Sequence, residues 1–167
     1  RINNLEQQAI VKNIEIKNIK NKTMSAFDVV KKIAASINVD ITEDDISKAY
    51  RLKKQEDKII VEFSSLKKKS ELMEKIERHR VDAKTINDEN NTEGNNSNNN
   101  NSKYLYINDQ LTFNNRQLLW LAKTKAKECN WKFVWVRNGK IFARKSENSS
   151  LNIINNAADI ESITLTI

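Results

Sequence analysis

The chain has 167 residues, of which 31% are charged and 38% hydrophobic, a balance typical of a folded protein with a thin apolar interior. It holds 29 Lys or Arg and 22 Asp or Glu residues, and the net charge of +7 favours polyanionic partners. A single cysteine excludes an internal disulfide, and no apolar span of membrane length occurs. We therefore expect an intracellular protein, located in the cytoplasm, the nucleus or a virion, with no membrane insertion.

Residues 1–12 predict a helix in which Ile2, Leu5 and Ala9 have the a/d/a spacing of a coiled coil. Two turns are too short for a stable coiled coil, so this helix either lies on the following domain or ends an oligomer stem. Because the chain opens on Arg1 rather than Met, we expect a trimmed fragment. A homo-oligomer is then expected only when the upstream coiled coil is present, and the fragment alone should be monomeric or weakly associating.

Residues 13–108 predict an α+β domain. Alternating and helical patterns indicate strands at 13–19, 48–53, 58–63 and 104–108 and helices at 25–37 and from Leu66 onward. The order β-α-β-β-α-β predicts a ferredoxin-like sandwich of the kind found in RRM domains. Thr42 with Asp45 predicts a capping box. Residues 88–102 are polar and Asn-rich, and they predict a disordered loop before the last strand.

Residues 109–167 predict a second, smaller α+β lobe. Thr112 can cap a helix whose inner face includes Leu118, Leu121, Ala122 and Cys129. Residues 131–145 predict a β-hairpin around Asn138-Gly139, the preferred sequence of a type I′ turn. Residues 151–155 and 158–163 then read as a strand and a short helix.

The two faces of the hairpin carry different side chains. One face holds the aromatic and cationic residues Trp131, Phe133, Trp135, Arg137, Lys140, Phe142 and Arg144. The other face holds the aliphatic residues Val134, Val136, Ile141 and Ala143. If the aliphatic face packs on the helix, an aromatic and cationic surface remains for stacking and phosphate contact. In the alternative, the aromatic rings form the core and the cations flank it. The sequence leaves both open.

An ordered set of stretches resembles a known family. RINNLEQ with NIEI, ITEDDI with YRL, IIVEF, YINDQLT and FVWVRNGKI resemble, in this order, the few-polyhedra (FP) proteins of baculoviruses and other insect viruses. They also resemble the cellular and retrotransposon-derived insect relatives of these proteins. The plan that this implies is that of the first-frame proteins of LINE retrotransposons, which are trimeric single-stranded nucleic-acid chaperones. The resemblance implies a helical stem at 1–12, an RRM-like domain at 13–108 and a C-terminal domain at 109–167. FP proteins are implicated in virion and occlusion-body formation.

Two departures from this family stand out. Relatives commonly continue after NIEI with a Gly-hydrophobic-Pro turn, where this chain has Asn18, Ile19 and Lys20. The polar insertion at 88–102 is also long. The first departure concerns the loop that follows the first strand of the RRM-like domain.

Features of enzymes are weak in this sequence. The only glycines are Gly94 and Gly139, which excludes glycine-rich phosphate and dinucleotide fingerprints. The lone His79 lies in a charged helix end, and Cys129 reads as a small core residue. We therefore expect a non-enzymatic protein that needs no metal and no cofactor.

The positions where an RRM carries base-stacking aromatics hold Glu15, Lys58 and Ile60 instead. Contacts from this sheet would therefore come from Lys17, Lys58 and either Tyr104 or Tyr106 rather than from base readout. In the alternative, the sheet is a scaffold. The strongest charge excess lies at 103–146, where ten Lys or Arg residues accompany only Asp109 and Glu128, a net charge of +8.

Two functions remain open. The first is non-specific binding of single-stranded RNA or DNA by the basic C-terminal lobe, as a chaperone or nucleocapsid-associated factor. The candidate contacts are Arg137, Lys140, Arg144 and Trp135 in the hairpin, with Arg116, Lys123 and Lys127 as outer contacts. The second is a virion or occlusion-body structural protein, or an adaptor, whose basic face binds virion proteins.

Overall fold

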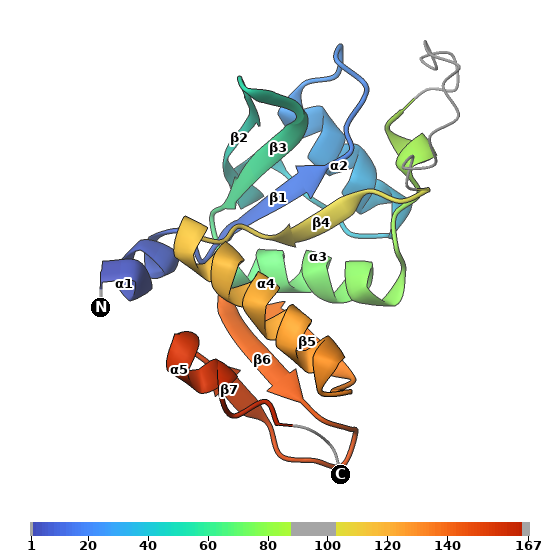
Figure 1. Cartoon of the computed structure of the whole chain (residues 1–167). Coiled ribbons are helices and arrows are strands. Elements are labelled where there is room, and N and C mark those ends of the chain that lie inside the picture. The colour runs from blue at the N-terminus through green and yellow to red at the C-terminus, as the bar shows by residue number, and fades with distance from the viewer. Residues whose placement is uncertain (1, 88–102, 165–167) are drawn as a thin grey trace. The chain divides into compact units, whose positions relative to one another are not determined.

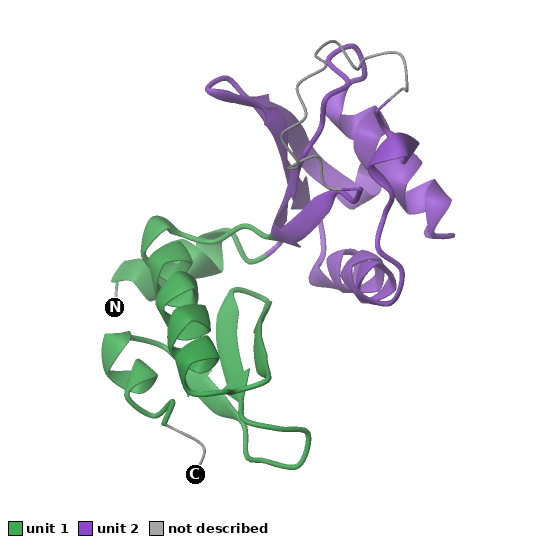
Figure 2. Ribbon diagram, turned by 45° about the vertical axis from the view of Figure 1, so that its right-hand side comes forward, with its two compact units in different colours: residues 1–11, 109–167 green, residues 12–108 purple. Residues whose placement is uncertain are grey.

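The computed structural model of the chain describes residues 2–87 and 103–164. Within these residues it is a mixed α+β protein with two antiparallel sheets and five α-helices, which confirms the predicted class. The chain forms two compact units (Figure 2): residues 12–108, here called the central unit, and residues 1–11 with 109–167, here called the terminal unit. The Asn-rich tract predicted as a loop at 88–102 lies outside the described residues.

The central unit contains a four-stranded sheet with the strand order β2-β3-β1-β4. Its elements, labelled in Figure 1, are β1 (Asn13–Lys17), α2 (Ala26–Ser36), β2 (Ile46–Leu52), β3 (Gln55–Phe63), α3 (Leu66–Arg78) and β4 (Tyr106–Asp109), with 3₁₀ turns at Glu43–Asp45 and Ala83–Thr85. Ser25 and Ser65 cap α2 and α3 by accepting hydrogen bonds from the backbone N–H three residues on. The predicted capping box of Thr42 and Asp45 is confirmed.

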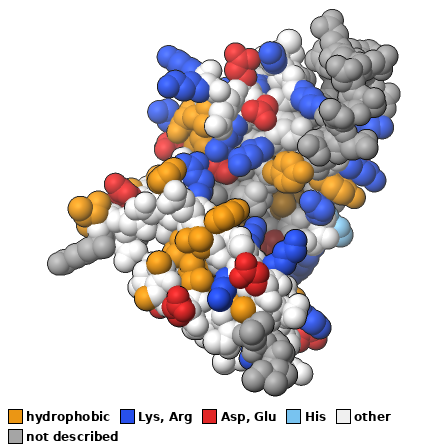
Figure 3. Space-filling model, in the orientation of Figure 1, with side chains coloured by type: hydrophobic (Ala, Val, Ile, Leu, Met, Phe, Trp, Pro, Cys, Tyr) orange, Lys and Arg blue, Asp and Glu red, His pale blue; other side chains and the backbone are white. Residues whose placement is uncertain are grey.

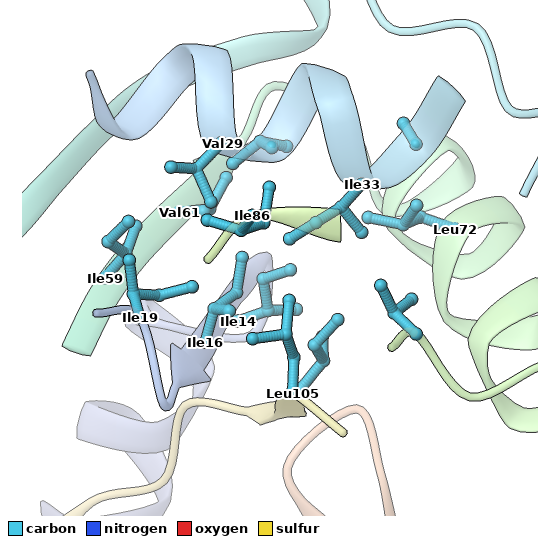
Figure 4. Close-up of a cluster of buried hydrophobic side chains, with 14 of the residues drawn as sticks. Ile14, Ile16, Ile19, Val29, Ile33, Ile59, Val61, Leu72, Ile86 and Leu105 are labelled. Atoms are coloured by element: carbon cyan, nitrogen blue, oxygen red, sulfur yellow. The ribbon is translucent and has the colours of Figure 1, made fainter. Parts of the chain in front are cut away.

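One face of this sheet packs against the helices to form the core (Figure 4). Because successive strand residues point to opposite faces, Ile14 and Ile16 of β1 reach the same side as Ile59 and Val61 of β3. They meet Ile33 of α2, Leu72 of α3, Ile107 of β4 and Leu105, the residue before β4.

The loop after β1, where the family pattern is absent, is held by polar side chains of the same unit. Asn18 adopts φ 72°, a left-handed conformation that asparagine tolerates better than most residues. The Arg51 guanidinium donates to the carbonyls of Asn21 (2.7 Å) and Met24 (2.8 Å). The Asn87 side chain accepts from the N–H of Lys20 at 2.8 Å. These bonds fix the loop without a Gly or Pro residue.

The terminal unit combines a three-stranded sheet, in the order β5-β6-β7, with three helices. Its elements are α1 (Ile2–Ala9), α4 (Phe113–Glu128), β5 (Phe133–Arg137), β6 (Lys140–Arg144), β7 (Asn152–Ile154) and α5 (Ala157–Ile160). The predicted cap of α4 is confirmed, since the Thr112 hydroxyl accepts from the N–H of Asn115. In Figure 2, α4 lies alongside the sheet.

A turn at the end of α4 places Trp131 in the core. The N–H of Trp131 donates to the Ala126 carbonyl (2.8 Å), and the N–H of Asn130 donates to the Lys127 carbonyl. Asn130 adopts φ 60°. This is the Schellman ending of a helix, in which the residue two positions after the cap makes a hydrophobic contact with the last turn. Trp131 is accordingly 9% exposed, and its indole N–H donates to the Thr164 carbonyl at 2.8 Å.

The N-terminal helix α1 is attached to the terminal unit through polar side chains. Gln7, 7% exposed, accepts hydrogen bonds from the Thr112 N–H (2.9 Å) and the Asn115 side chain (3.0 Å), and it donates to the Gln110 carbonyl (2.9 Å). Ile2 and Leu5 are 74% and 64% exposed. The helix therefore lies on the domain through its polar face and leaves the apolar seam accessible.

Candidate functional site

The β5–β6 hairpin forms as the sequence predicts. Asn138 and Gly139 form the turn with φ 49° and 76°, the sign that a type I′ turn requires at both positions. Strand pairing sets Phe133 opposite Arg144, Trp135 opposite Phe142 and Arg137 opposite Lys140.

The aliphatic face of the hairpin is the one that packs on α4. Ile141 and Ala143 are 1% and 0% exposed, and they belong to one cluster with Leu118, Ala122 and Ala126 of the helix. Val134 and Val136 pack against this cluster from β5. Of the two arrangements that the sequence left open, the structure adopts the one that places the aromatic residues of the strands on the outer face.

Aromatic rings line the outer face of the sheet in mutual contact. Trp135 and Phe142 stack with ring centroids 5.5 Å apart and an interplanar angle of 21°. The Arg144 guanidinium lies 5.1 Å from the ring centroid of Phe133 and 5.9 Å from that of Trp135, within the range of cation–π attraction. Its Nε is buried without a hydrogen-bond partner in the described part of the chain. The rings therefore hold the guanidinium in place.

Arg137 and Lys140 stand beside this aromatic group, next to the turn. They are directly opposite in the strand register, and both are exposed. No carboxylate forms an ion pair with either side chain among the residues that the structure describes. Two unneutralised cations on adjacent strands can contact phosphate oxygens, while the neighbouring half-buried rings leave part of their surface for bases.

The turn itself is fixed from two sides within the terminal unit. The Gly139 N–H donates to the Asp109 carboxylate at 3.0 Å, in a buried position. A Cβ at Gly139 would lie 2.7 Å from Nε2 and 2.8 Å from Cγ of Gln7, the residue that attaches α1. Arg137 and Lys140 therefore project from a backbone that is held in place.

Replacing Gly139 with alanine should destabilise the terminal unit by about 1 to 2 kcal/mol for the positive φ, and further because Gln7 has to move. Urea unfolding followed by tryptophan fluorescence measures this. Asn138→Gly is the matched control, since glycine accepts the same turn conformation without a new contact. Equal stability of Gly139→Ala and the parent would contradict the fixed turn.

A cleft of about 200 Å³ lies beside the turn. It is lined by the side-chain amides of α1, by Asn115, Asn138 and Asn155, and by Lys140. Amides donate and accept hydrogen bonds but carry no charge. The cleft can therefore hold an uncharged polar group next to a cation.

The structure does not bring all the predicted contacts together. Arg116, Lys123 and Lys127 are exposed on the face of α4 that points away from the sheet, so they cannot share a surface with Arg137, Lys140 and Arg144. Leu121, predicted on the inner face of the helix, is 42% exposed, and Trp131, predicted with the aromatic face, is in the core.

Sequence reasoning missed two aromatic residues of α4. Phe113 and Trp120 are 64% and 66% exposed. The signal was present, because at 100° per residue both fall on the side opposite Ala122, so the helix has apolar residues on two faces.

The cations predicted on the sheet of the central unit differ in availability. The Lys58 ammonium is 3.0 Å from the Glu15 carboxylate, and both side chains are buried. The charge of Lys58 is therefore compensated within the protein, and its role as a nucleic-acid contact stays a prediction. Lys17 is 3.5 Å from the same carboxylate, with 46% of its side chain exposed. Glu15 of β1 lies opposite Ile60 of β3, on the face of the sheet that points away from the core. These are positions where an RRM carries base-stacking rings, and neither holds an aromatic residue here.

No group of three or more His, Cys, Asp or Glu side chains within 2–87 and 103–164 could hold a metal ion. No helix in these ranges is long and apolar enough to cross a membrane.

Comparison with known proteins identifies one family. The model of baculovirus FP protein domain 2 matches residues 112–164, the span that contains α4, the hairpin, β7 and α5. No curated protein matches the chain. The resemblance drawn from the sequence to the baculovirus FP family is confirmed in this segment.

Proposed function

We propose that this chain, whose residues 112–164 match the model of baculovirus FP protein domain 2, is a viral FP-like protein. We further propose that it binds single-stranded nucleic acid without sequence specificity. The observation that carries the proposal is the outer face of the hairpin, where the Trp135–Phe142 stack lies beside the exposed pair Arg137 and Lys140. Binding of a single strand needs flat rings for bases and cations for phosphates, and this surface supplies both.

Arg144 has a supporting role in this proposal. Its guanidinium lies over Phe133 and Trp135, so it brings a positive charge to the rings themselves. A base that stacks on these rings would contact the Arg144 guanidinium, and the phosphates of the same strand would contact Arg137 and Lys140. Nothing in this set provides a base-specific pattern of donors and acceptors, and for this reason the proposed binding is sequence-tolerant.

We also infer that the central unit is an RRM-like scaffold. The element order β1-α2-β2-β3-α3-β4 and the strand order β2-β3-β1-β4 support this, since a ferredoxin-like sandwich has both. The burial of Glu15 and Lys58 supports a scaffold role rather than a binding role for its sheet. The shared plan with LINE first-frame proteins, the upstream coiled coil, and chaperone activity stay predictions.

The proposal describes a binding protein and not an enzyme. Cys129, the one thiol of the chain, is 3% exposed and packs in the core of the terminal unit. A nucleophile has to reach its substrate, and a thiol in this position does not.

Fluorescence anisotropy with a labelled single strand over a salt series tests the proposal. If about five phosphates are engaged, log K should fall by about 3.5 units per tenfold rise in salt, at roughly 0.7 per phosphate contact. Arg137→Ala and Lys140→Ala should each weaken binding to the same extent for strands of different sequence. Each should also lower the slope of log K against log salt by about 0.7, the value of one phosphate contact. Both residues are exposed, so melting should be nearly unchanged.

Lys31→Ala/Lys32→Ala is the matched control. It removes the same charge from exposed positions on α2, and it should leave the slope almost unchanged. If Arg137→Ala/Lys140→Ala binds as tightly as the parent at every salt concentration, the hairpin is not the site. The virion adaptor function then becomes the better explanation of the basic surface.

A further inference from the structure

The outer face of α4 carries two aromatic rings that the core does not use. Phe113 and Trp120 are 64% and 66% exposed, whereas the helix packs through Leu118, Ala122 and Ala126 on its opposite side. The two rings are seven residues apart, which is about two turns and roughly 10 Å along the axis. Rings that remain this exposed contribute little to folding, which leaves them available for an interaction.

Three cations share this face with the rings. Arg116, Lys123 and Lys127 follow Phe113 at the helical spacings that place residues on one side, and all three are exposed. No carboxylate in the described ranges forms an ion pair with them. In Figure 3, which views the molecule as in Figure 1, hydrophobic side chains lie on the surface over α4 with Lys and Arg side chains nearby. Glu128 is the one acidic residue of the helix.

The order of these side chains favours a single strand over a docked helix. A partner helix needs a continuous apolar stripe at i, i+3, i+4 and i+7. Here Arg116 and Gln117 stand between the two rings, and Lys123 and Thr124 follow Trp120. Rings separated by cations and uncharged polar groups match the alternation of bases and phosphates along a strand.

The position of α4 separates this face from the hairpin surface. The helix covers the inner face of the sheet, and Trp135, Phe142 and Arg144 lie on the outer face. The two surfaces therefore point away from a shared core in opposite directions. A short strand bound to one surface cannot reach the other.

We propose that the outer face of α4 is a second single-strand site, with Trp120 and Phe113 as stacking rings and Arg116, Lys123 and Lys127 as phosphate contacts. The terminal unit then holds two strand segments at once, one on each side, and can bring two strands together. This inference rests on the proposed function of the hairpin surface, and it adds a second site and the bridging of strands.

The stoichiometry of strand binding tests the inference. A labelled oligothymidine of about six nucleotides, within the site size of a small binding fold, is titrated into the full chain at low salt. We expect two strands per chain for the parent and one for Phe113→Ala/Trp120→Ala. The remaining strand should bind with parental affinity, while affinity at the α4 face falls by about thirty-fold or more, because two stacking rings are lost.

Tryptophan fluorescence separates the two sites. All three tryptophans, at 120, 131 and 135, belong to the terminal unit, and Trp131 is buried. In a Trp135→Phe variant the exposed emission comes from Trp120, and oligothymidine should quench it. In a Trp120→Phe variant, quenching should report on Trp135 instead. Energy transfer between two differently labelled, non-complementary strands should appear with the parent and vanish with Phe113→Ala/Trp120→Ala.

Each outcome decides one of the two proposals. Two bound strands and unchanged energy transfer for Phe113→Ala/Trp120→Ala would overturn the α4 site and leave that face to another partner. If Arg137→Ala/Lys140→Ala binds one oligothymidine strand instead of two, and the quenching of Trp120 is unchanged, both sites are supported. If the hairpin variant changes nothing while the α4 variant abolishes binding, the hairpin function fails and two-strand binding fails with it.

Discussion

Replacing Trp131 with alanine is expected to lower the free energy of unfolding of the terminal unit by about 3 to 5 kcal/mol, because the indole is 9% exposed and fills the core beside Ala126 and Cys129. The loss also leaves the Thr164 carbonyl without its indole donor. Urea unfolding followed by the emission of Trp120 and Trp135 measures the change.

The other two tryptophans provide matched controls for this experiment. Trp120→Ala removes a ring that is 66% exposed, so its stability should stay within about 0.5 kcal/mol of the parent. Trp135→Ala removes the stacking partner of Phe142, and it should cost about 1 to 3 kcal/mol of strand affinity with a smaller loss of stability than Trp131→Ala. If Trp135→Ala were the most destabilising of the three, the outer face of the sheet would be part of the core.

Replacing Glu15 with alanine should destabilise the central unit by about 3 to 5 kcal/mol. Glu15 and Lys58 are both buried, and their charged groups are 3.0 Å apart. Removal of one partner leaves a buried charge without compensation, which costs more than the pair contributes. Hydrogen exchange of the β1 and β3 amides measures the change, and tryptophan fluorescence serves as an independent reference because it reports on the terminal unit alone.

The double variant Glu15→Ala/Lys58→Met is the control for this prediction. It removes both charges and keeps an apolar side chain of similar length, so most of the lost stability should return. Strand affinity should be the same for the parent and the double variant, because Lys58 is paired with Glu15. A clear loss of affinity in the double variant at unchanged stability would support Lys58 as a nucleic-acid contact.

Local chemistry determined most of the elements. The Thr42–Asp45 capping box, the Thr112 cap and the Asn138-Gly139 turn were all predicted, and all three occur. Each depends on residues within four positions of one another, so the sequence pattern contains the complete interaction. Reading the two strands against the aromatic positions of an RRM likewise placed Glu15 and Lys58 on one face, although it did not show that they pair.

The tertiary structure alone decided which faces are covered. Alternation shows that Trp135 and Arg144 share a face, and it cannot say whether that face is buried when both faces of the hairpin carry apolar groups. In the fold, the small Ala122 and Ala126 of α4 let the helix approach Ile141 and Ala143 closely, and the rings remain outside. The same packing buries one side of α4, which leaves Trp120 on the surface. Trp131 does not follow the alternation of the hairpin, because it lies in the Schellman turn at the end of α4 and not in the strand. That turn directs its side chain into the core.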